Sequence, residues 1–290
     1  MGKDLKIVYL PLHGVFGLIL VLIFWPFNWF STGLRTHIGF FPLWLGYCLF
    51  VDAWTYRRAG TSLFYRKPVA YGGLFFASVP LWWLFELINK KTGNWFYLGE
   101  EQFGAIFFFL FSSLSFSTVL PAVFGTAELV STFLGRGGLK FPLPLSRKLY
   151  RYLFIAGWFA LLLICLWPRY FYPLVWVFLF LLLEPVNFWL GGRSLLDCLM
   201  KGEAGPIVSL SLGALICGFF WEFWNYLSYP KWVYCIPFFD FLHLFEMPLL
   251  GYLGYIPFSW ELFSLYHFLL HLAGFRHLQD YLKLPPGKES

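Results

Sequence analysis

Eight apolar stretches of about twenty residues restrict what this chain can fold into more than any other feature of its sequence. They cover approximately residues 7–29, 38–55, 69–89, 102–124, 151–168, 172–190, 205–225 and 236–256, and a ninth apolar stretch follows at 257–273. The hydrocarbon core of a bilayer is ~30 Å thick and accommodates about 20 residues of helix. Backbone amides in that core must be hydrogen-bonded within their own segment, so the stretches predict transmembrane helices.

The amino-acid composition excludes a soluble protein. Hydrophobic residues make up 59% of the 290 residues and charged residues only 12%, and the mean hydropathy is +0.67. A soluble domain needs about a quarter of its residues charged to cover its surface. Disorder, collagen and coiled coil are also excluded, because the apolar content is high and neither a glycine period nor heptads are present. We therefore expect an all-α polytopic membrane protein.

Lysine and arginine are distributed asymmetrically along the chain. With a cytoplasmic N-terminus, the inside loops and the C-terminal tail hold sixteen of the 21 basic residues and the outside loops hold five. Positive charge is retained on the cytoplasmic side, so both termini are predicted to be cytoplasmic. The net charge of +6 then reflects topology and not a nucleic-acid surface.

The ninth apolar stretch, 257–273, bears on the number of crossings. A full ninth crossing would place the basic tail outside. We therefore expect 257–273 to be a kinked or re-entrant continuation of the eighth helix, which leaves eight transmembrane helices. Nine full crossings are the alternative.

The two halves of the chain carry the same motifs in the same order. An E-x-x-N motif precedes a W-x-Y motif in both halves: Glu86, Asn89 and 95–97 in the first, Glu222, Asn225 and 232–234 in the second. Two more acidic pairs recur, Asp52 with Glu184 and Glu128 with Glu261. Four crossings per half is an even number, so the halves are predicted to be parallel-oriented internal repeats related by an axis along the membrane normal.

This duplication divides the chain into four parts. They are a first membrane repeat at 1–134, a basic cytoplasmic linker at 135–150, a second membrane repeat at 151–273 and a basic cytoplasmic tail at 274–290. By symmetry the linker corresponds to the tail, which agrees with a cytoplasmic tail.

Acidic residues within the apolar stretches are the candidates for chemistry. Eight of the fifteen acids lie within or at the ends of these stretches, and no Lys or Arg lies deep in a predicted helix to pair with them. A carboxylate at the bilayer centre costs on the order of 3 kcal/mol even on the gentlest scale. We expect these acids to lie near an interface, to be protonated or hydrogen-bonded, or to hold a cation.

The acids on the predicted outer side form the candidate site. Three titratable groups within two turns of the predicted helix 236–256 have no counterpart in the first half, and with Glu222 they are the predicted catalytic set: Glu222, Asp240, His243 and Glu246. The predicted substrate-binding set is Glu86, Asn89, Asn225, Trp95, Trp232 and Tyr234. The alternative is interfacial capping, in which Glu and Asn bind loop amides and the aromatic residues form a membrane-interface belt.

Metal and cofactor sites are not predicted. His267 and His271 have the i, i+4 spacing of a metal-binding pair, but a structural pair is favoured because no H-E-x-x-H or E-x-x-H motif is present. The five cysteines form no C-x-x-C pair, and no P-loop or dinucleotide fingerprint occurs. Asp52 and Glu184 each precede a Gly-x-Ser-Leu turn with nearby Arg, which fits either a bound phosphate headgroup or a salt-bridged helix end.

Three functions remain open. Aromatic residues make up 24% of the chain, and a cavity lined with rings suits an apolar or polyene substrate whose developing positive charge the ring faces stabilise. The first hypothesis is an integral membrane enzyme that acts by acid/base chemistry on a membrane-dissolved lipid or isoprenoid-like substrate. The alternatives are a transporter or channel with parallel repeats, and a non-catalytic membrane subunit or scaffold. The expected partners are the lipid bilayer and an apolar small molecule.

Overall fold

Helices dominate the computed structural model, which describes residues 9–134 and 146–286. Helix accounts for 74% of the structure. Within the described ranges, six helices are long and apolar enough to cross a membrane, or seven if one bent pair counts as a span. The protein is therefore an all-α membrane protein in its architecture. Most of the predicted linker, residues 135–145, lies outside the described ranges.

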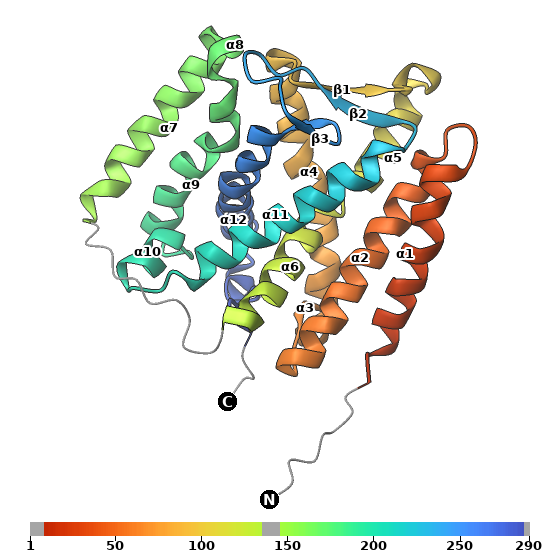
Figure 1. Cartoon of the computed structure of the whole chain (residues 1–290). Helices are drawn as coiled ribbons and strands as arrows, with labels where there is room; N and C mark the ends of the chain where they lie inside the picture. Colours follow the sequence, from red (N-terminus) through yellow and green to blue (C-terminus); the bar gives the residue numbers. More distant parts are fainter. Residues whose placement is uncertain (1–8, 135–145, 287–290) are drawn as a thin grey trace, which may run out of the picture.

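The first half contains four long helical segments. Its elements are α1 (Leu12–Phe30), α2 (Thr36–Ala59), α3 (Leu63–Arg66), α4 (Pro68–Thr92), β1 (Trp95–Leu98), a 3-10 turn η1 (Glu100–Gln102), α5 (Ala105–Phe116) and α6 (Val119–Leu134). α1 packs along α2, and α2 and α4 both contact α6. The β1 strand lies at the opposite end of the bundle from α3 and from the start of α1 (Figure 1).

The second half has more short elements between its long helices. Its elements are α7 (Lys148–Leu166), α8 (Pro168–Phe171), η2 (Tyr172–Trp176), α9 (Phe178–Trp189), α10 (Leu195–Met200), α11 (Gly205–Tyr226), β2 (Lys231–Tyr234), β3 (His243–Leu244), β4 (Met247–Pro248), η3 (Leu249–Gly254), α12 (Tyr255–Leu272) and η4 (Arg276–Leu278). The segments Pro168–Trp176 and Phe178–Trp189 are the bent pair, with a 43° bend.

The predicted stretch 102–124 is divided between α5 and α6 because side chains replace the helical hydrogen bonds there. The hydroxyls of Ser117 and Thr118 donate to the carbonyls of Leu114 and Ser115 at 2.6 and 2.8 Å. Ser78 of α4 fills the gap: its hydroxyl donates to the Phe116 carbonyl at 2.7 Å and accepts from the Leu120 amide at 3.1 Å. Local hydroxyl bonds of this kind compete with the helix and bend it.

The predicted helix over 236–256 is wrong. Residues between Ile236 and Gly254 form loops, the short β3 and β4 strands and a 3-10 turn. Pro237 and Pro248 cannot donate backbone hydrogen bonds, and Phe238, Leu242 and Phe245 adopt positive φ angles of 68°, 53° and 59°, which no helix tolerates.

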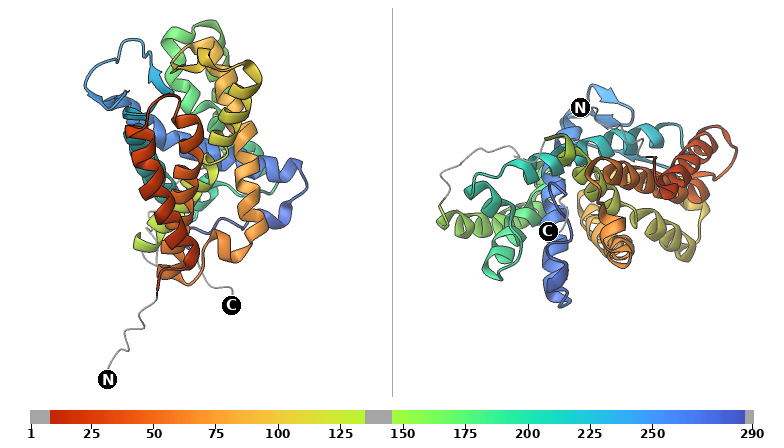
Figure 2. Two further views of the ribbon diagram at one scale, coloured as in Figure 1. Left: turned by 90° about the vertical axis from the view of Figure 1, so that its right-hand side faces the viewer. Right: turned by 90° about the horizontal axis from the view of Figure 1, so that it is seen from below.

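The ninth stretch is a separate helix and not a continuation of an eighth. It forms α12, whose residues are mostly buried in the bundle. α12 contacts α4, α9 and α11, and the view from below shows it running between the two halves (Figure 2).

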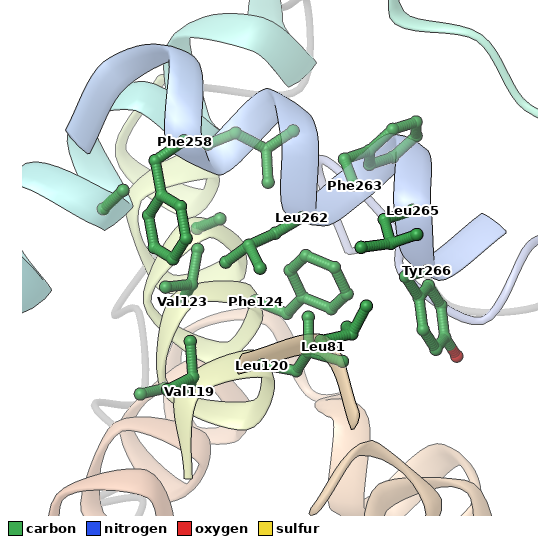
Figure 3. Close-up of a cluster of buried hydrophobic side chains, with 14 of the residues drawn as sticks. Leu81, Val119, Leu120, Val123, Phe124, Phe258, Leu262, Phe263, Leu265 and Tyr266 are labelled. Carbon is green, nitrogen blue, oxygen red and sulfur yellow. The ribbon is translucent and has the colours of Figure 1, made fainter. Parts of the chain in front are cut away.

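The centre of the bundle is an apolar contact between α6 and α12. Figure 3 shows the side chains of α6, with Leu81 of α4, meeting those of α12: Leu81, Val119, Leu120, Val123 and Phe124 on one side, and Phe258, Leu262, Leu265 and Tyr266 on the other, while Phe263 lies on the far side of α12. All ten are buried and belong to one hydrophobic cluster. This contact runs along much of the length of α12.

Candidate functional site

The strands β1 and β2 bring the two W-x-Y motifs side by side. They pair antiparallel, with Trp95 opposite Tyr234 and Tyr97 opposite Trp232. Successive side chains of a strand point to opposite faces, so these four aromatic residues share one face of the ribbon. Two motifs that are more than a hundred residues apart in the chain therefore form one surface.

The asparagine of each E-x-x-N motif anchors the strand that follows it. Asn89 donates its side-chain amide to the Trp95 carbonyl at 2.7 Å and accepts from the Asn94 amide at 2.8 Å. Asn225 donates to the Trp232 carbonyl at 2.7 Å and accepts from the Trp232 amide at 3.0 Å. Both side chains are thus occupied by backbone groups and position the strands.

Glu86 of α4 accepts hydrogen bonds from three aromatic side chains. The indole N–H groups of Trp82 and Trp95 donate to Oε1 at 2.9 and 3.0 Å, and the Tyr97 hydroxyl donates to the same oxygen at 2.5 Å. No Lys or Arg pairs with this carboxyl in the described part of the chain.

Glu222 of α11 has the corresponding set of donors. The Tyr234 hydroxyl donates to Oε1 at 2.6 Å, the Tyr255 hydroxyl at 2.9 Å and the Trp232 indole at 3.4 Å. Glu222 is fully buried, and its second oxygen has no hydrogen-bond partner among the described residues. Tyr255 comes from the first turn of α12, so this network joins three separate elements.

The tyrosines of both networks are held in their protonated form. Burial, together with the neighbouring Glu86 carboxyl, raises the pKa of the Tyr97 phenol well above its ordinary value. Burial and Glu222 have the same effect on Tyr234. Both hydroxyls therefore remain available to donate a hydrogen bond at physiological pH.

A cavity of about 500 Å³ lies against these two networks. The side chains of all six donors to Glu86 and Glu222 line it: Trp82, Trp95, Tyr97, Trp232, Tyr234 and Tyr255. Neither carboxyl is part of the lining, so each lies behind an aromatic wall and reaches the cavity only through its tyrosine and tryptophan donors. Further rings from α5, η2 and α12 complete a wall that is mostly apolar: Phe108, Phe111, Phe116, Trp176 and Phe258.

The structure separates the predicted catalytic residues. Only Glu222 lies beside the cavity. Asp240 and His243 pair with each other at 2.8 Å on an exposed loop, with side chains 56% and 41% exposed. Glu246 forms an ion pair with Lys231, and of the two only Lys231 lines the cavity. The set does not converge because Asp240, His243 and Glu246 lie on the irregular segment 236–254 and not on one helix.

The predicted substrate-binding residues fall into three groups. Trp95, Trp232 and Tyr234 line the cavity, and Glu86 lies behind them. Asn89 and Asn225 bind the strands and do not line the cavity.

Of the six donors that line the cavity, three were not predicted as site residues: Trp82, Tyr97 and Tyr255. Tyr97 could have been, because it is the counterpart of Tyr234 in the repeated motif. Trp82 and Tyr255 carried no such signal, since one is an aromatic residue in an apolar helix and the other enters only through the folding of 236–254.

The acids at the other end of the bundle are bound by their own loops. Asp52 accepts from the Ser62 hydroxyl at 2.8 Å and from the Phe64 amide at 3.0 Å. Glu184 accepts from the Ser194 hydroxyl at 2.6 Å and the Leu196 amide at 2.7 Å. The two acids therefore hold the Gly-x-Ser-Leu turns that follow them in the same way.

Glu128 is paired with a cation that comes from outside the long helices. Arg66 of the short helix α3 forms an ion pair with this buried carboxyl. The Lys283 amide also donates to Glu128, at 3.0 Å. The sequence pattern did not indicate this ion pair, because Arg66 lies in a short connecting segment that folds back against α6. The histidine pair has no shared ligand geometry, since His267 faces the Phe263 and Gln279 carbonyls at 2.8 and 3.2 Å, and His271 lies 3.5 Å from Arg276.

Comparison of this chain with known protein families, with characterised proteins and with solved structures finds no match. The function therefore has to be inferred from the geometry of the cavity and its two carboxyl networks.

Proposed function

We propose that the protein is an integral membrane enzyme that acts by acid/base chemistry on an apolar, unsaturated, isoprenoid-like lipid dissolved in the membrane. One observation carries this proposal: two carboxyl groups are bonded to neutral O–H and N–H donors whose rings line one cavity. A cavity of about 500 Å³ is within the range that encloses a small organic ligand. Its aromatic lining favours an apolar one.

One of the two networks can give a proton to the substrate, and the other can accept a proton from it. A proton leaves one network through its tyrosine, replaced from the carboxyl behind it, and adds to a carbon of a double bond. The adjacent carbon then carries positive charge, which the faces of the surrounding rings stabilise. Loss of a proton from a neighbouring carbon to the other network completes the reaction. The substrate gains and loses one proton, so the product is an isomer, by double-bond shift or ring closure, and no oxidant or reductant is consumed.

The topology that accompanies this proposal has eight crossings in two parallel repeats, 1–134 and 151–273, with both termini cytoplasmic. Four helical segments in each half support it, with α12 as the eighth crossing. α12 can contain Glu261 and His267 because its surroundings are protein side chains and not lipid. The matching hydrogen bonds of Asp52 and Glu184 also favour a duplication.

Transport is favoured less, since packed side chains fill the bundle below the cavity. The contact between α6 and α12 closes the interior there with residues such as Phe124 and Leu262. A scaffold is also favoured less, because a cavity of this size forfeits packing contacts that a purely structural protein would gain by filling it.

The test is conversion of membrane lipids by the full-length protein. Membranes that contain the protein are incubated with an apolar lipid extract. The lipids are then separated by chromatography, and their masses are measured by mass spectrometry. We expect one unsaturated lipid to change its retention time at unchanged mass. Glu222→Gln should bind that lipid without converting it, because the amide keeps the acceptor oxygen and loses the exchangeable acid proton.

The matched control is Glu203→Gln, which alters an exposed carboxyl outside the cavity. It should convert the lipid at the wild-type rate. Conversion at the wild-type rate by Glu222→Gln would remove Glu222 from the reaction. Equal loss of stability in Glu86→Gln and Glu222→Gln, with no lipid converted by the wild type, would instead indicate a scaffold.

A further inference from the structure

Asn94 is a polar side chain in the apolar wall of the cavity. It precedes β1, lines the cavity and is 5% exposed. Its backbone is fully used: the amide donates to Asn89 at 2.8 Å, and the carbonyl accepts from the Cys235 amide at 2.8 Å. Its side-chain amide makes no hydrogen bond with any residue in 9–134 or 146–286, and the nitrogen is inaccessible to solvent.

A buried amide without a partner is unfavourable for folding. Most buried side-chain polar atoms in native proteins have a partner, and a buried polar group without one loses its hydration with no compensation. A leucine at position 94 would avoid this cost, because it is of similar size and its apolar side chain would fit an apolar wall. A polar residue at this position is therefore expected to serve a ligand.

We propose that the ligand of the cavity is an amphiphile with one oxygen-bearing end group, a hydroxyl or a carbonyl, that pairs with the side-chain amide of Asn94. This inference deepens the proposed function and rests on it. As the side chain stands, a hydroxyl can donate to the amide oxygen; half a turn of the amide about its last bond presents the nitrogen instead, which donates to a hydroxyl or a carbonyl oxygen. Asn94 is then a specificity-determining residue, and the chemistry remains with the two carboxyl networks.

The strands define how such a ligand lies. Asn94 bonds to Cys235, directly after the end of β2, whereas Thr36 bonds through its amide to the carbonyl of Tyr229, before β2 begins, at 3.0 Å. Thr36 also lines the cavity. Four strand residues span about 13 Å, so the two polar side chains lie at opposite ends of the ribbon. The oxygen lies at the Trp95 and Tyr234 end, and the apolar chain extends along the ribbon past Tyr97 and Trp232.

The test compares two probes that differ in a single oxygen. All-trans-retinol carries a terminal hydroxyl, and axerophthene is the hydrocarbon with the same polyene. Both quench tryptophan fluorescence by energy transfer, and five tryptophans line the cavity: Trp82, Trp95, Trp176, Trp221 and Trp232. Titration of the full-length protein in detergent gives the affinity for each probe. We expect retinol to bind roughly tenfold more tightly than axerophthene, as one additional hydrogen bond to a buried unpaired group predicts.

Two variants test which residue causes the preference for retinol. Asn94→Leu should bind both probes equally, with an affinity for axerophthene no weaker than that of the wild type. Thr36 is the rival, because its hydroxyl is also buried in the cavity wall without a partner among the described residues; Thr36→Val should nevertheless retain the preference for retinol, since the ligand oxygen lies at the Asn94 end. Because the Asn94 side chain has no hydrogen-bond partner in the part of the chain that the structure describes, Asn94→Leu should also unfold at the wild-type temperature or about 2–4 °C higher. A structural asparagine would show the opposite shift.

The outcomes separate this inference from the proposed function. Equal affinity of the wild-type protein for the two probes would overturn the role of Asn94 and leave the apolar cavity and its acid/base chemistry standing. A preference for retinol that survives in Asn94→Leu, or that disappears in Thr36→Val alone, would overturn it as well. Failure of both probes to bind would count against the proposed function itself.

Discussion

Trp95 lies opposite Tyr234 in the β1–β2 ribbon, so a donor to Glu86 and a donor to Glu222 are cross-strand neighbours. Each carboxyl comes from a different half of the chain. The ribbon is thus the element that joins the two networks at one cavity. Its side chains, and not the carboxyls themselves, are the groups that a ligand would touch.

The hydroxyls of Tyr97 and Tyr234 should be required for turnover. Tyr97→Phe and Tyr234→Phe keep the ring in the cavity wall and break the link to Glu86 or Glu222. Loss of a positioned proton donor or acceptor typically lowers a rate by about 10²–10⁴-fold. The rate of lipid conversion and the affinity for the same lipid are measured together. Phe111→Leu, at another point of the wall, should change affinity more than rate, and a wild-type rate in both tyrosine variants would contradict the proposed proton path.

The ion pair between Arg66 and Glu128 should be essential for stability. Their side chains are only 8% and 1% exposed. Arg66→Met leaves an unpaired buried carboxyl and should cost about 3–5 kcal/mol, whereas the double variant with Glu128→Leu should recover much of that loss. Thermal unfolding in detergent measures the difference. Lys201→Met, which breaks the exposed pair with Asp197, should leave stability unchanged; a small loss in Arg66→Met would show that Glu128 is not charged in the folded protein.

The two Gly-x-Ser-Leu turns should contribute equally to stability. Ser62 donates to Asp52 and accepts from the Tyr65 amide at 3.5 Å, and Ser194 donates to Glu184 and accepts from the Asp197 amide at 3.0 Å. Removing a capping hydroxyl costs typically about 1 kcal/mol. Ser62→Ala and Ser194→Ala should therefore lower the unfolding temperature by similar amounts. An effect confined to one variant would argue against equivalent roles in the two halves.

Close packing of α1 on α2 should depend on Gly17 and Gly46. A Cβ atom on Gly46 would lie 2.6 Å from the Gly17 carbonyl oxygen, and one on Gly17 would lie 2.6 Å from the Gly46 oxygen. Small residues allow such backbone contact between membrane helices. Gly46→Val should destabilise the protein by about 1–3 kcal/mol in detergent unfolding. Gly73→Val adds a Cβ that meets no atom within 4 Å and is the control; equal unfolding in both variants would show that this contact is not needed.

Polar residues in apolar stretches were the most informative part of the sequence. Glu86 and Glu222 stand out because a carboxyl in a hydrophobic helix is costly unless it is satisfied. The W-x-Y motif beside each one pointed to the residues that satisfy them, and Trp95, Trp232 and Tyr234 line the cavity. Local spacing was sufficient here because each donor follows its acid within twelve residues.

Partners that are distant in the chain could not be predicted in this way. Tyr255 reaches Glu222 only because the segment before it is a compact loop, and Arg66 reaches Glu128 only because α3 folds back. The predicted helix over 236–256 is wrong because apolar content alone does not distinguish a compact apolar loop from a transmembrane segment. The two prolines of 236–254 and the ion pair of Glu246 with Lys231 decide against a helix.

The sequence by itself determined that the chain is a bundle of membrane helices, since long apolar segments in lipid have almost no other way to satisfy their backbone hydrogen bonds. It also determined which acids would need partners. Only the tertiary structure decided which partners they have and that a cavity lies between them. Hydrophobicity is a property that each segment carries alone, whereas a hydrogen bond or a cavity exists only between segments, and their distances are set by how the whole bundle packs.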